Sequence, residues 1–354
     1  MKIAPDDGLL QYSGRIDFGN PKAPVFVYAG SWVKIRFRGT AVSAEITNHR
    51  SYFTNYIGFI LDGEQGRFSL TPDERTREYI IGRRLPQGEH ELLLFKRMDA
   101  CHYFSFHGFV LDEGGKPLPP AEMPGRRIEV FGDSVSCGEV SEAVDYVGKP
   151  DPEHDGEFSN SWYSYSWMTA RALNAELHIT AQGGAALLDG TGWFHGPDYI
   201  GMESIYDKLE YNPDLRPAVK KWDFRSWTPH VVVIAIGQND ANPENYMAED
   251  YASEKSENWR QRYRAFLEGL GELYPQAHFI LTTTILNHDP AWDKAIDQVC
   301  QELDSPRVHH FLYTANGCGT PGHIRIPEAE RMAEELSAYI NSLGDIWNEH
   351  SSKL

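Results

Sequence analysis

The sequence lacks any long hydrophobic run and is short of basic residues. Nowhere do about eighteen uncharged apolar residues follow one another, the length that a membrane-spanning helix needs. The first residues, Met1–Asp7, have no apolar segment of the kind found in a signal peptide, so we expect a cytoplasmic protein. Thirty-three Lys and Arg against 51 Asp and Glu give a net charge of −18. Because this charge repels nucleic acid and anionic membrane surfaces, neither is expected as a partner.

Cysteine is also scarce. The four cysteines are widely spaced and form no CxxC pair, and they are Cys101, Cys137, Cys300 and Cys318. This spacing favours reduced thiols and gives no indication of a metal site. A composition of 41% apolar residues over 354 positions is that of an ordinary folded protein, long enough for two domains.

The first third of the chain has the pattern of β-strands. Val33–Gly39 alternates apolar and basic residues, as a half-buried strand does, and similar runs follow at Tyr56–Leu61, Glu91–Phe95 and Phe104–Leu111. No convincing helical stretch separates them, which predicts an antiparallel β-sandwich over residues 1–118. Glycine and proline then become frequent between Asp112 and Arg127, and we place a linker at residues 119–126.

The remainder of the chain, residues 127–354, alternates short apolar runs with helical periodicity. Val231–Ile236 is continuously apolar, as in a strand of a parallel sheet that is buried on both faces. Helical spacing follows between Trp259 and Leu273 and between Met332 and Leu343. We predict a three-layer α/β/α domain with a parallel sheet. Two long irregular stretches, Val140–Asn160 and Leu187–Thr228, have the length of functional loops.

A candidate nucleophile follows the first strand of this domain. Gly132-Asp133-Ser134 comes directly after the apolar run Ile128–Phe131, and the carboxyl ends of parallel strands line the ligand crevice. Chance alone would place Gly-Asp-Ser in roughly one chain in ten of this length. Taken alone, Ser134 is better interpreted as a helix cap.

Three further elements follow strand-like runs. Gly183 in Gln182-Gly183-Gly184 could offer a backbone N–H, Asn239 in Gly237-Gln238-Asn239-Asp240 an amide, and His323 in Pro321-Gly322-His323 a base. Each of them alone is better interpreted as a turn or as a surface residue. Their order, Ser, Gly, Asn and His, is much harder to attribute to chance.

With these four blocks the sequence resembles the SGNH hydrolases, and more closely carbohydrate esterase family two, which places a jelly-roll sandwich before the catalytic domain. The resemblance spans nearly the whole chain, including Val33–Ile46, Leu61–Gly63, Gln87–His90 and Phe106–Phe109, and Arg127–Ser134 is similar to the family's nucleophile block. It implies that Ser134 attacks an acetyl carbonyl and that His323 is the general base. It also implies an oxyanion hole made by the N–H groups of Ser134 and Gly183 and the side chain of Asn239.

One position departs from the pattern of these hydrolases. They commonly carry an Asp two residues before the histidine, where this chain has Pro321. We therefore predict a Ser134–His323 dyad in which the backbone carbonyl of Pro321 accepts the Nδ1–H of His323. An Asp or Glu side chain bonded to His323 would contradict this prediction.

Aromatic residues near the crevice are candidates for stacking on sugar rings. Trp292 lies where the resembling family often has such a residue, and Trp193 follows the Gly183 block. Packing in the core is the alternative for both.

Together these features predict an esterase that removes O-acetyl groups from xylan- or mannan-type oligosaccharides without metal or cofactor. A lipid or thioester hydrolase on the same scaffold is one alternative, although the loops are rich in Asp, Gly and Tyr rather than in apolar runs. A carbohydrate-binding protein with an inactive second domain is another. The long loops also leave room for a homo-oligomer.

Overall fold

The computed structural model describes residues 1–215 and 219–347. Its first part is an antiparallel sheet of ten strands, hydrogen-bonded in the order β3-β4-β9-β5-β8-β6-β7, with β1 on β9 and with β2 and β10 on β5. The strands are β1 Lys2–Ile3, β2 Gln11–Ser13, β3 Ile16–Asp17, β4 Val25–Phe26, β5 Trp32–Arg50, β6 Tyr56–Leu61, β7 Glu64–Ser69, β8 Arg77–Lys96, β9 His102–Leu111 and β10 Lys116–Leu118.

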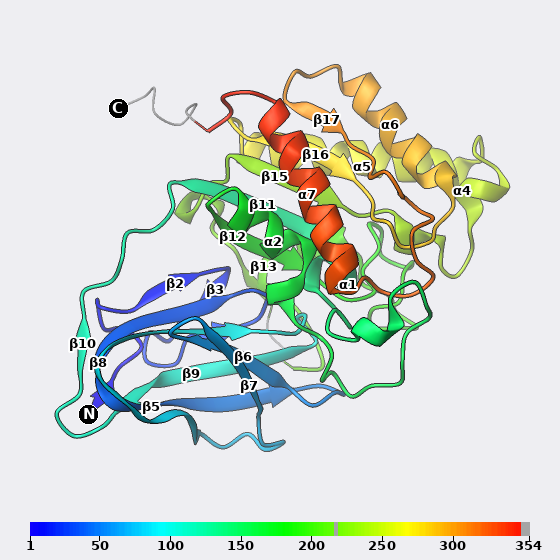
Figure 1. Ribbon diagram of the computed structural model, residues 1–354. Coiled ribbons are helices and arrows are strands. Elements are labelled where there is room, and N and C mark those ends of the chain that lie inside the picture. The colour runs from blue at the N-terminus through cyan, green and yellow to red at the C-terminus, as the bar shows by residue number, and fades with distance from the viewer. Residues whose placement is uncertain (216–218, 348–354) are drawn as a thin grey trace.

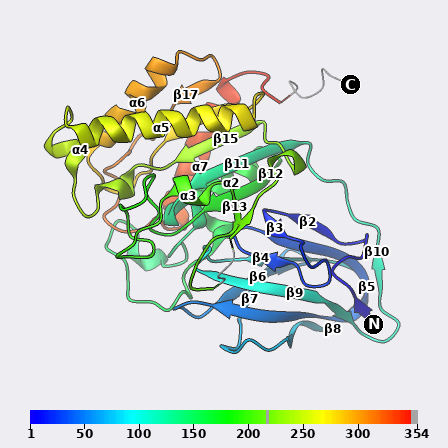
Figure 2. The same ribbon diagram turned by 180° about the vertical axis from the view of Figure 1, so that it is seen from behind.

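The alternation in β5 determines which side chains enter the core. Val33, Ile35 and Phe37 are buried in an apolar cluster, whereas the basic residues between them face Glu89 and Glu91 of β8. The pairing of β5 with β8 shifts register after Gly39 and again after Val42. Such irregularities bend a strand, which lets two long strands wrap around one core. In both views β2 and β3 lie toward the second domain (Figures 1 and 2).

The second part is built on a parallel sheet with the strand order β12-β11-β15-β16-β17. These strands are β11 Arg126–Gly132, β12 Ala175–Ala181, β15 Val231–Ala235, β16 His278–Thr282 and β17 Val308–His310. The short pair β13 Lys208–Glu210 and β14 Lys220–Lys221 lies outside this sheet. All five residues of β15 are buried, as expected for a strand covered on both faces.

Helices cover both faces of the parallel sheet (Figures 1 and 2). On one face α2, Tyr165–Ala172, packs against α7, Ile326–Ser342, and on the other α5, Glu254–Leu273, packs against α6, Pro290–Leu303. The short helices are α1 Ser134–Cys137, η1 Val144–Tyr146, η2 Ser161–Tyr163, α3 Met202–Ile205, η3 Phe224–Ser226, η4 Gln238–Ala241 and α4 Tyr246–Glu249. The predicted order of an antiparallel β domain followed by a parallel α/β/α domain is confirmed.

The predicted linker, residues 119–126, falls where β10 ends and β11 begins, at Leu118 and Arg126. The exact domain limits stay a prediction, and the last seven residues of the predicted second domain lie outside the described part of the chain. In the described residues, no helix is long and apolar enough to cross a membrane.

Candidate active site

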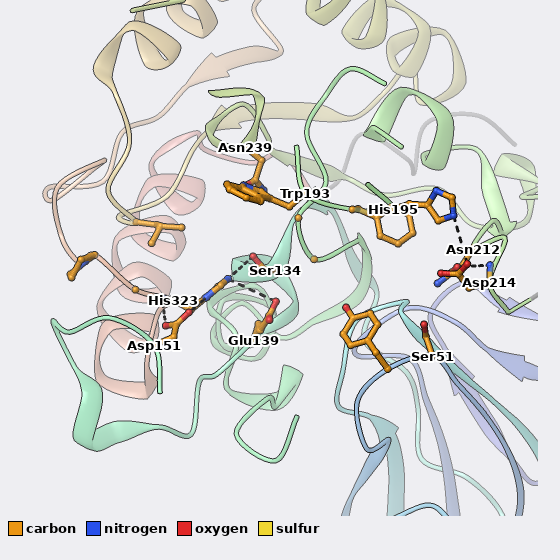
Figure 3. A pocket seen from close by; sticks show the side chains of 17 residues that line it. Ser51, Ser134, Glu139, Asp151, Trp193, His195, Asn212, Asp214, Asn239 and His323 are labelled. Carbon is orange, nitrogen blue, oxygen red and sulfur yellow. Dashed lines mark hydrogen bonds and ion pairs between the residues drawn. The ribbon is translucent and has the colours of Figure 1, made fainter. Parts of the chain in front are cut away.

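A cavity of about 560 Å³ opens at the carboxyl edge of the parallel sheet. Both domains line it, since Ser51 and Tyr52 come from the segment between β5 and β6 (Figure 3). The second domain contributes the remaining lining residues, Ser134, Glu139, Asp151, Gly183, Gly184, Trp193, Phe194, His195, Asn212, Asp214, Asn239, Leu286, Pro321, Gly322 and His323. The volume is that of an ordinary small-molecule site.

Ser134 stands where β11 turns into the single turn of α1. Asp133 caps this turn by accepting a hydrogen bond from the Val135 N–H at 3.0 Å. A side chain at Gly132 would come within 2.1 Å of the Ser136 Oγ, so the tight exit from the strand requires glycine at that position. The local sequence thereby fixes Ser134 at the edge of the cavity.

His323 contacts both Ser134 and a carboxylate. Its Nε2 lies 2.8 Å from the Ser134 Oγ, and its Nδ1 lies 2.5 Å from the Asp151 Oδ2 (Figure 3). The predicted dyad with the Pro321 carbonyl as third partner is therefore wrong. The ring has its carboxylate partner after all, but that partner stands 172 residues earlier in the chain. Ser134, His323 and Asp151 have the mutual geometry of a serine-hydrolase triad.

Asp151 is held in this position by more than the imidazole. Its Oδ1 accepts hydrogen bonds from the His323 backbone N–H and from the Arg325 Nη2, both at 2.8 Å. A side chain at Gly322 would come within 2.7 Å of the same oxygen, so glycine lets the Asp151 loop pack against the histidine loop. Burial works in the opposite direction, but the bonds to His323 and the charge of Arg325 hold the pKa of Asp151 well below its usual range.

The pKa of the imidazole is shifted in turn. Burial lowers it, yet the negative charges of Glu139 and Asp151 prevail and raise the pKa of His323 to about 9. Glu139 places its Oε2 3.8 Å from the His323 Nε2, on the side of the ring that faces Ser134 (Figure 3). The imidazole ring of His323 thus lies between two carboxylates.

Asn239 follows β15 and lines the cavity as predicted, but its amide group already has acceptors. The Nδ2 donates to the Asp133 Oδ2 at 3.0 Å and to the Ala185 carbonyl at 3.1 Å. Gln238 donates to the same Asp133 oxygen at 2.6 Å. Burial raises the pKa of Asp133 to about 6. Asp133 therefore joins the nucleophile turn to the Asn239 turn.

Gly183 also lines the cavity, at the end of β12, and its N–H is likewise engaged. It donates to the Asp99 Oδ2 at 2.9 Å, and the Gln182 Nε2 donates to the same oxygen at 2.8 Å. Asp99 belongs to the β domain, in the segment between β8 and β9. The turn expected to supply an oxyanion donor is thus held by the other domain.

The two aromatic candidates have different surroundings. Trp193 lines the cavity and is 64% exposed, as a side chain free to stack on a sugar would be. Trp292 is completely buried in α6, packs edge-on against Trp259 and donates its indole N–H to Asn245 at 3.0 Å. The expectation that Trp292 lines the substrate site is wrong, because its side chain packs in the core.

Three carboxylates of the site were missed by the motif comparison. Asp151 and Glu139 lie in or next to the long stretch Val140–Asn160, whose length alone indicated a functional loop, and Asp99 lies in the β domain. Among the described residues, no cluster of three or more His, Cys, Asp or Glu side chains could hold a metal ion.

Known proteins resemble this chain over most of its length. Residues 12–120 match the family model "Carbohydrate esterase 2 N-terminal". The chain is 30% identical to Cellulase/esterase CelE of Acetivibrio thermocellus over 96% of its own residues, but spans 40% of that protein's length. It is 26% identical to an acetylxylan esterase / glucomannan deacetylase of Cellvibrio japonicus, covering 97% of this chain and 91% of the relative.

A solved structure, a family two carbohydrate esterase from Clostridium thermocellum in complex with cellohexaose, superposes with a TM-score of 0.78. It is 27% identical in sequence and covers 96% of this chain and 99% of its own. An antiparallel β domain before a parallel α/β domain, with Ser, Gly, Asn and His at one sheet edge, defines a hydrolase of the SGNH class. Within that class the chain is most similar, among these proteins, to members of carbohydrate esterase family two.

Proposed function

We propose that this protein is a carbohydrate O-acetyl esterase in which Ser134 is the nucleophile, His323 the general base and Asp151 the residue that orients the base. The observation that carries the proposal is the continuous chain of contacts from the Ser134 Oγ through both ring nitrogens of His323 to the Asp151 carboxylate. Asp151 accepts the Nδ1–H, so Nε2 is left with a lone pair directed at the serine hydroxyl.

The reaction proceeds in two steps. The Ser134 Oγ attacks the acetyl carbonyl while the His323 Nε2 takes its proton, and the same nitrogen then protonates the departing sugar oxygen. In the second step Nε2 removes a proton from water, which attacks the acetyl-serine; the bond to the Ser134 Oγ then breaks, Nε2 returns the proton to that oxygen, and acetate is released. The Ser134 N–H stabilises the oxyanion, because the first residue of a helix has no intrahelical acceptor. Gly183 and Asn239 add their donors when the substrate oxygen competes with their present acceptors.

Acetylated oligosaccharides of the xylan or mannan type are the proposed substrates. Relatives named acetylxylan esterase and glucomannan deacetylase support this choice, as does the exposed Trp193 beside the cavity. Polar groups such as Glu139, Asn212 and Asp214 line the site, and a long acyl chain would have to lie against them. A cytoplasmic location and a homo-oligomeric state stay predictions.

Acetate release from acetylated xylan, mannan and their oligomers, followed position by position by NMR, tests the proposal. We expect release by the wild type and a loss of at least about a thousandfold in Ser134→Ala, because the covalent step disappears. Ser342→Ala, at the exposed end of α7, is the control and should retain full activity.

Two outcomes favour the alternatives. Faster turnover of 4-nitrophenyl octanoate than of 4-nitrophenyl acetate would favour a lipid or thioester hydrolase. Glycan binding by the wild type without any acetate release would favour a carbohydrate-binding protein.

A further inference from the structure

The cavity extends well beyond the catalytic side chains. Figure 3 shows Ser134 and His323 toward one end of it and a second group of polar side chains toward the other. We name this second group the distal end, and its members are Ser51, His195, Asn212 and Asp214. Ser51 precedes β6 in the β domain, so the distal end lies where the two domains meet. The reaction of the proposed function involves only the end that holds Ser134.

The distal end offers a charged acceptor for hydroxyl groups. The Asp214 side chain is 59% exposed, and its Oδ1 lies 3.7 Å from the His195 Nε2. The Asp214 backbone N–H donates to the Asn212 Oδ1 at 3.0 Å, and Asn212 is almost completely buried. The carboxylate is therefore anchored through its own backbone while its oxygens remain open to the cavity. Since hydrogen bonds to a carboxylate are stronger than those between neutral groups, this end is suited to a sugar.

Tyr52 lies between the two ends of the cavity. It follows Ser51 of the distal end in the chain and lines the cavity with it. Tyr52 also lines a smaller recess together with Glu139, whose carboxylate is 3.8 Å from the His323 Nε2. A ligand that extends from the catalytic end to the distal end therefore passes Tyr52.

The ring of Tyr52 is held in this position and is still exposed. Its hydroxyl donates to the Cys101 Sγ at 2.8 Å, and the ring makes edge contacts with Phe53 and His102 at centroid distances of 4.6 and 5.4 Å. Tyr52 is nevertheless 59% exposed. Because Cys101 is buried, the hydroxyl end is directed inward and the exposed area is mainly that of the ring. A ring that is fixed in advance loses little side-chain entropy when the C–H face of a sugar packs on it.

We propose that the distal end is a second sugar subsite, in which Tyr52 packs against the sugar residue next to the acetylated one and Asp214 accepts a hydrogen bond from its hydroxyl groups. This inference rests on the proposed function and narrows the substrate class to acetylated oligosaccharides rather than acetylated single sugars. A simple acetate fills only the end that holds Ser134. A chain of two or more sugars makes contacts at both ends, and the additional binding energy raises kcat/KM.

The test compares three acetates with the wild type, Tyr52→Ala and Asp214→Ala. They are 4-nitrophenyl acetate, a mono-acetylated methyl pyranoside, and a trisaccharide of the same sugar with one acetyl group at the same position of its central residue. We expect the wild-type kcat/KM to be at least about tenfold higher for the trisaccharide than for the methyl pyranoside. For the trisaccharide it should fall about tenfold in Tyr52→Ala and about 3- to 10-fold in Asp214→Ala. For 4-nitrophenyl acetate both variants should change less than about threefold.

Two further variants separate the role of the ring from other effects. Tyr52→Phe keeps the ring and loses the bond to Cys101, so its kcat/KM for the trisaccharide should stay within about threefold of the wild type. Phe18→Ala is the matched control. Phe18 is an aromatic residue of the same domain that is 45% exposed and lies outside the lining of the cavity, so this variant should equal the wild type on all three substrates.

Equal losses on the trisaccharide and on 4-nitrophenyl acetate in Tyr52→Ala would overturn the inference, since Tyr52 would then only support the turn after β12 through Cys101 and Gln182. A wild type that does not distinguish the trisaccharide from the methyl pyranoside would overturn it as well. A wild type that releases acetate from neither sugar contradicts the proposed function itself, before any variant is compared.

Discussion

At the scale of single residues, the proposed mechanism makes activity depend on the protonation state of His323. Attack by Ser134 requires a neutral imidazole, and neighbouring carboxylates raise the pKa of His323 to about 9. The protonated ring cannot accept the serine proton, so activity is low below this pKa and rises as the pH rises through it. We expect the acid limb of kcat/KM for 4-nitrophenyl acetate to lie well above neutral pH. A limb near pH 6 would contradict this assignment.

Asp151→Asn separates the two effects of this carboxylate. Loss of its charge lowers the pKa of His323 and moves the acid limb to lower pH. Loss of the acceptor for the Nδ1–H lets the ring adopt the wrong tautomer, which should lower the plateau of kcat by about 10²- to 10⁴-fold. Full pH profiles of both proteins measure both changes. Glu153→Gln, on the same loop, is the control for the loss of one negative charge. An unchanged plateau of kcat in Asp151→Asn would mean that a backbone carbonyl, and not Asp151, orients the imidazole of His323.

At the scale of elements, strands and their ends were predictable and long-range partners were not. The period-two pattern of β5, the apolar run of β15 and the spacing in α5 and α7 report local burial, which the sequence carries directly.

The site shows the same division between local and long-range information. Ser134, Gly183, Asn239 and His323 follow local strand-and-turn signals, and all line one cavity. Asp151 reaches His323 from 172 residues away because Gly322 leaves room for it, and no local pattern records such a contact. The hydrogen bond from the Gly183 N–H to Asp99 joins two domains, so no local pattern could predict it either.

The segment between β8 and β9 gives a prediction at this scale. Asp99 holds the turn after β12 through Gly183 and Gln182 without lining the cavity itself. Asp99→Ala leaves the Gly183 N–H without its acceptor and removes one of the acceptors of the Gln182 Nε2, so we expect the turn to lose its position relative to Ser134. Since one oxyanion donor contributes about 10²- to 10³-fold, kcat/KM should fall at least about tenfold. The loss should be equal for sugar acetate and 4-nitrophenyl acetate. A loss confined to the sugar would instead mean that Asp99 contacts the substrate.

At the scale of the whole molecule, the two domains share a buried ion pair. Arg15, from the turn between β2 and β3, lies 2.8 Å from Glu129 in β11, and neither side chain is exposed. The guanidinium also lies over the ring of Phe131 at 5.3 Å, and Glu129 accepts hydrogen bonds from Thr180 and Tyr274 at 2.8 and 2.7 Å. The β domain is therefore joined to the strand that ends at the nucleophile, as well as to the Gly183 turn.

Removing one member of this pair should destabilise the protein more than removing the charges of both members. Arg15→Met leaves Glu129 buried and unpaired, and we expect a loss of about 3 to 5 kcal/mol in the free energy of unfolding. Arg15→Met combined with Glu129→Gln removes the remaining charge but keeps groups that can bond to Thr180 and Tyr274, so part of the loss should be recovered. Urea unfolding followed by fluorescence and circular dichroism measures both variants. If Arg15→Met left the midpoint unchanged, the ion pair would not contribute to holding the two domains together, and that role would fall to the remaining contacts between them, such as the bond from Gly183 to Asp99.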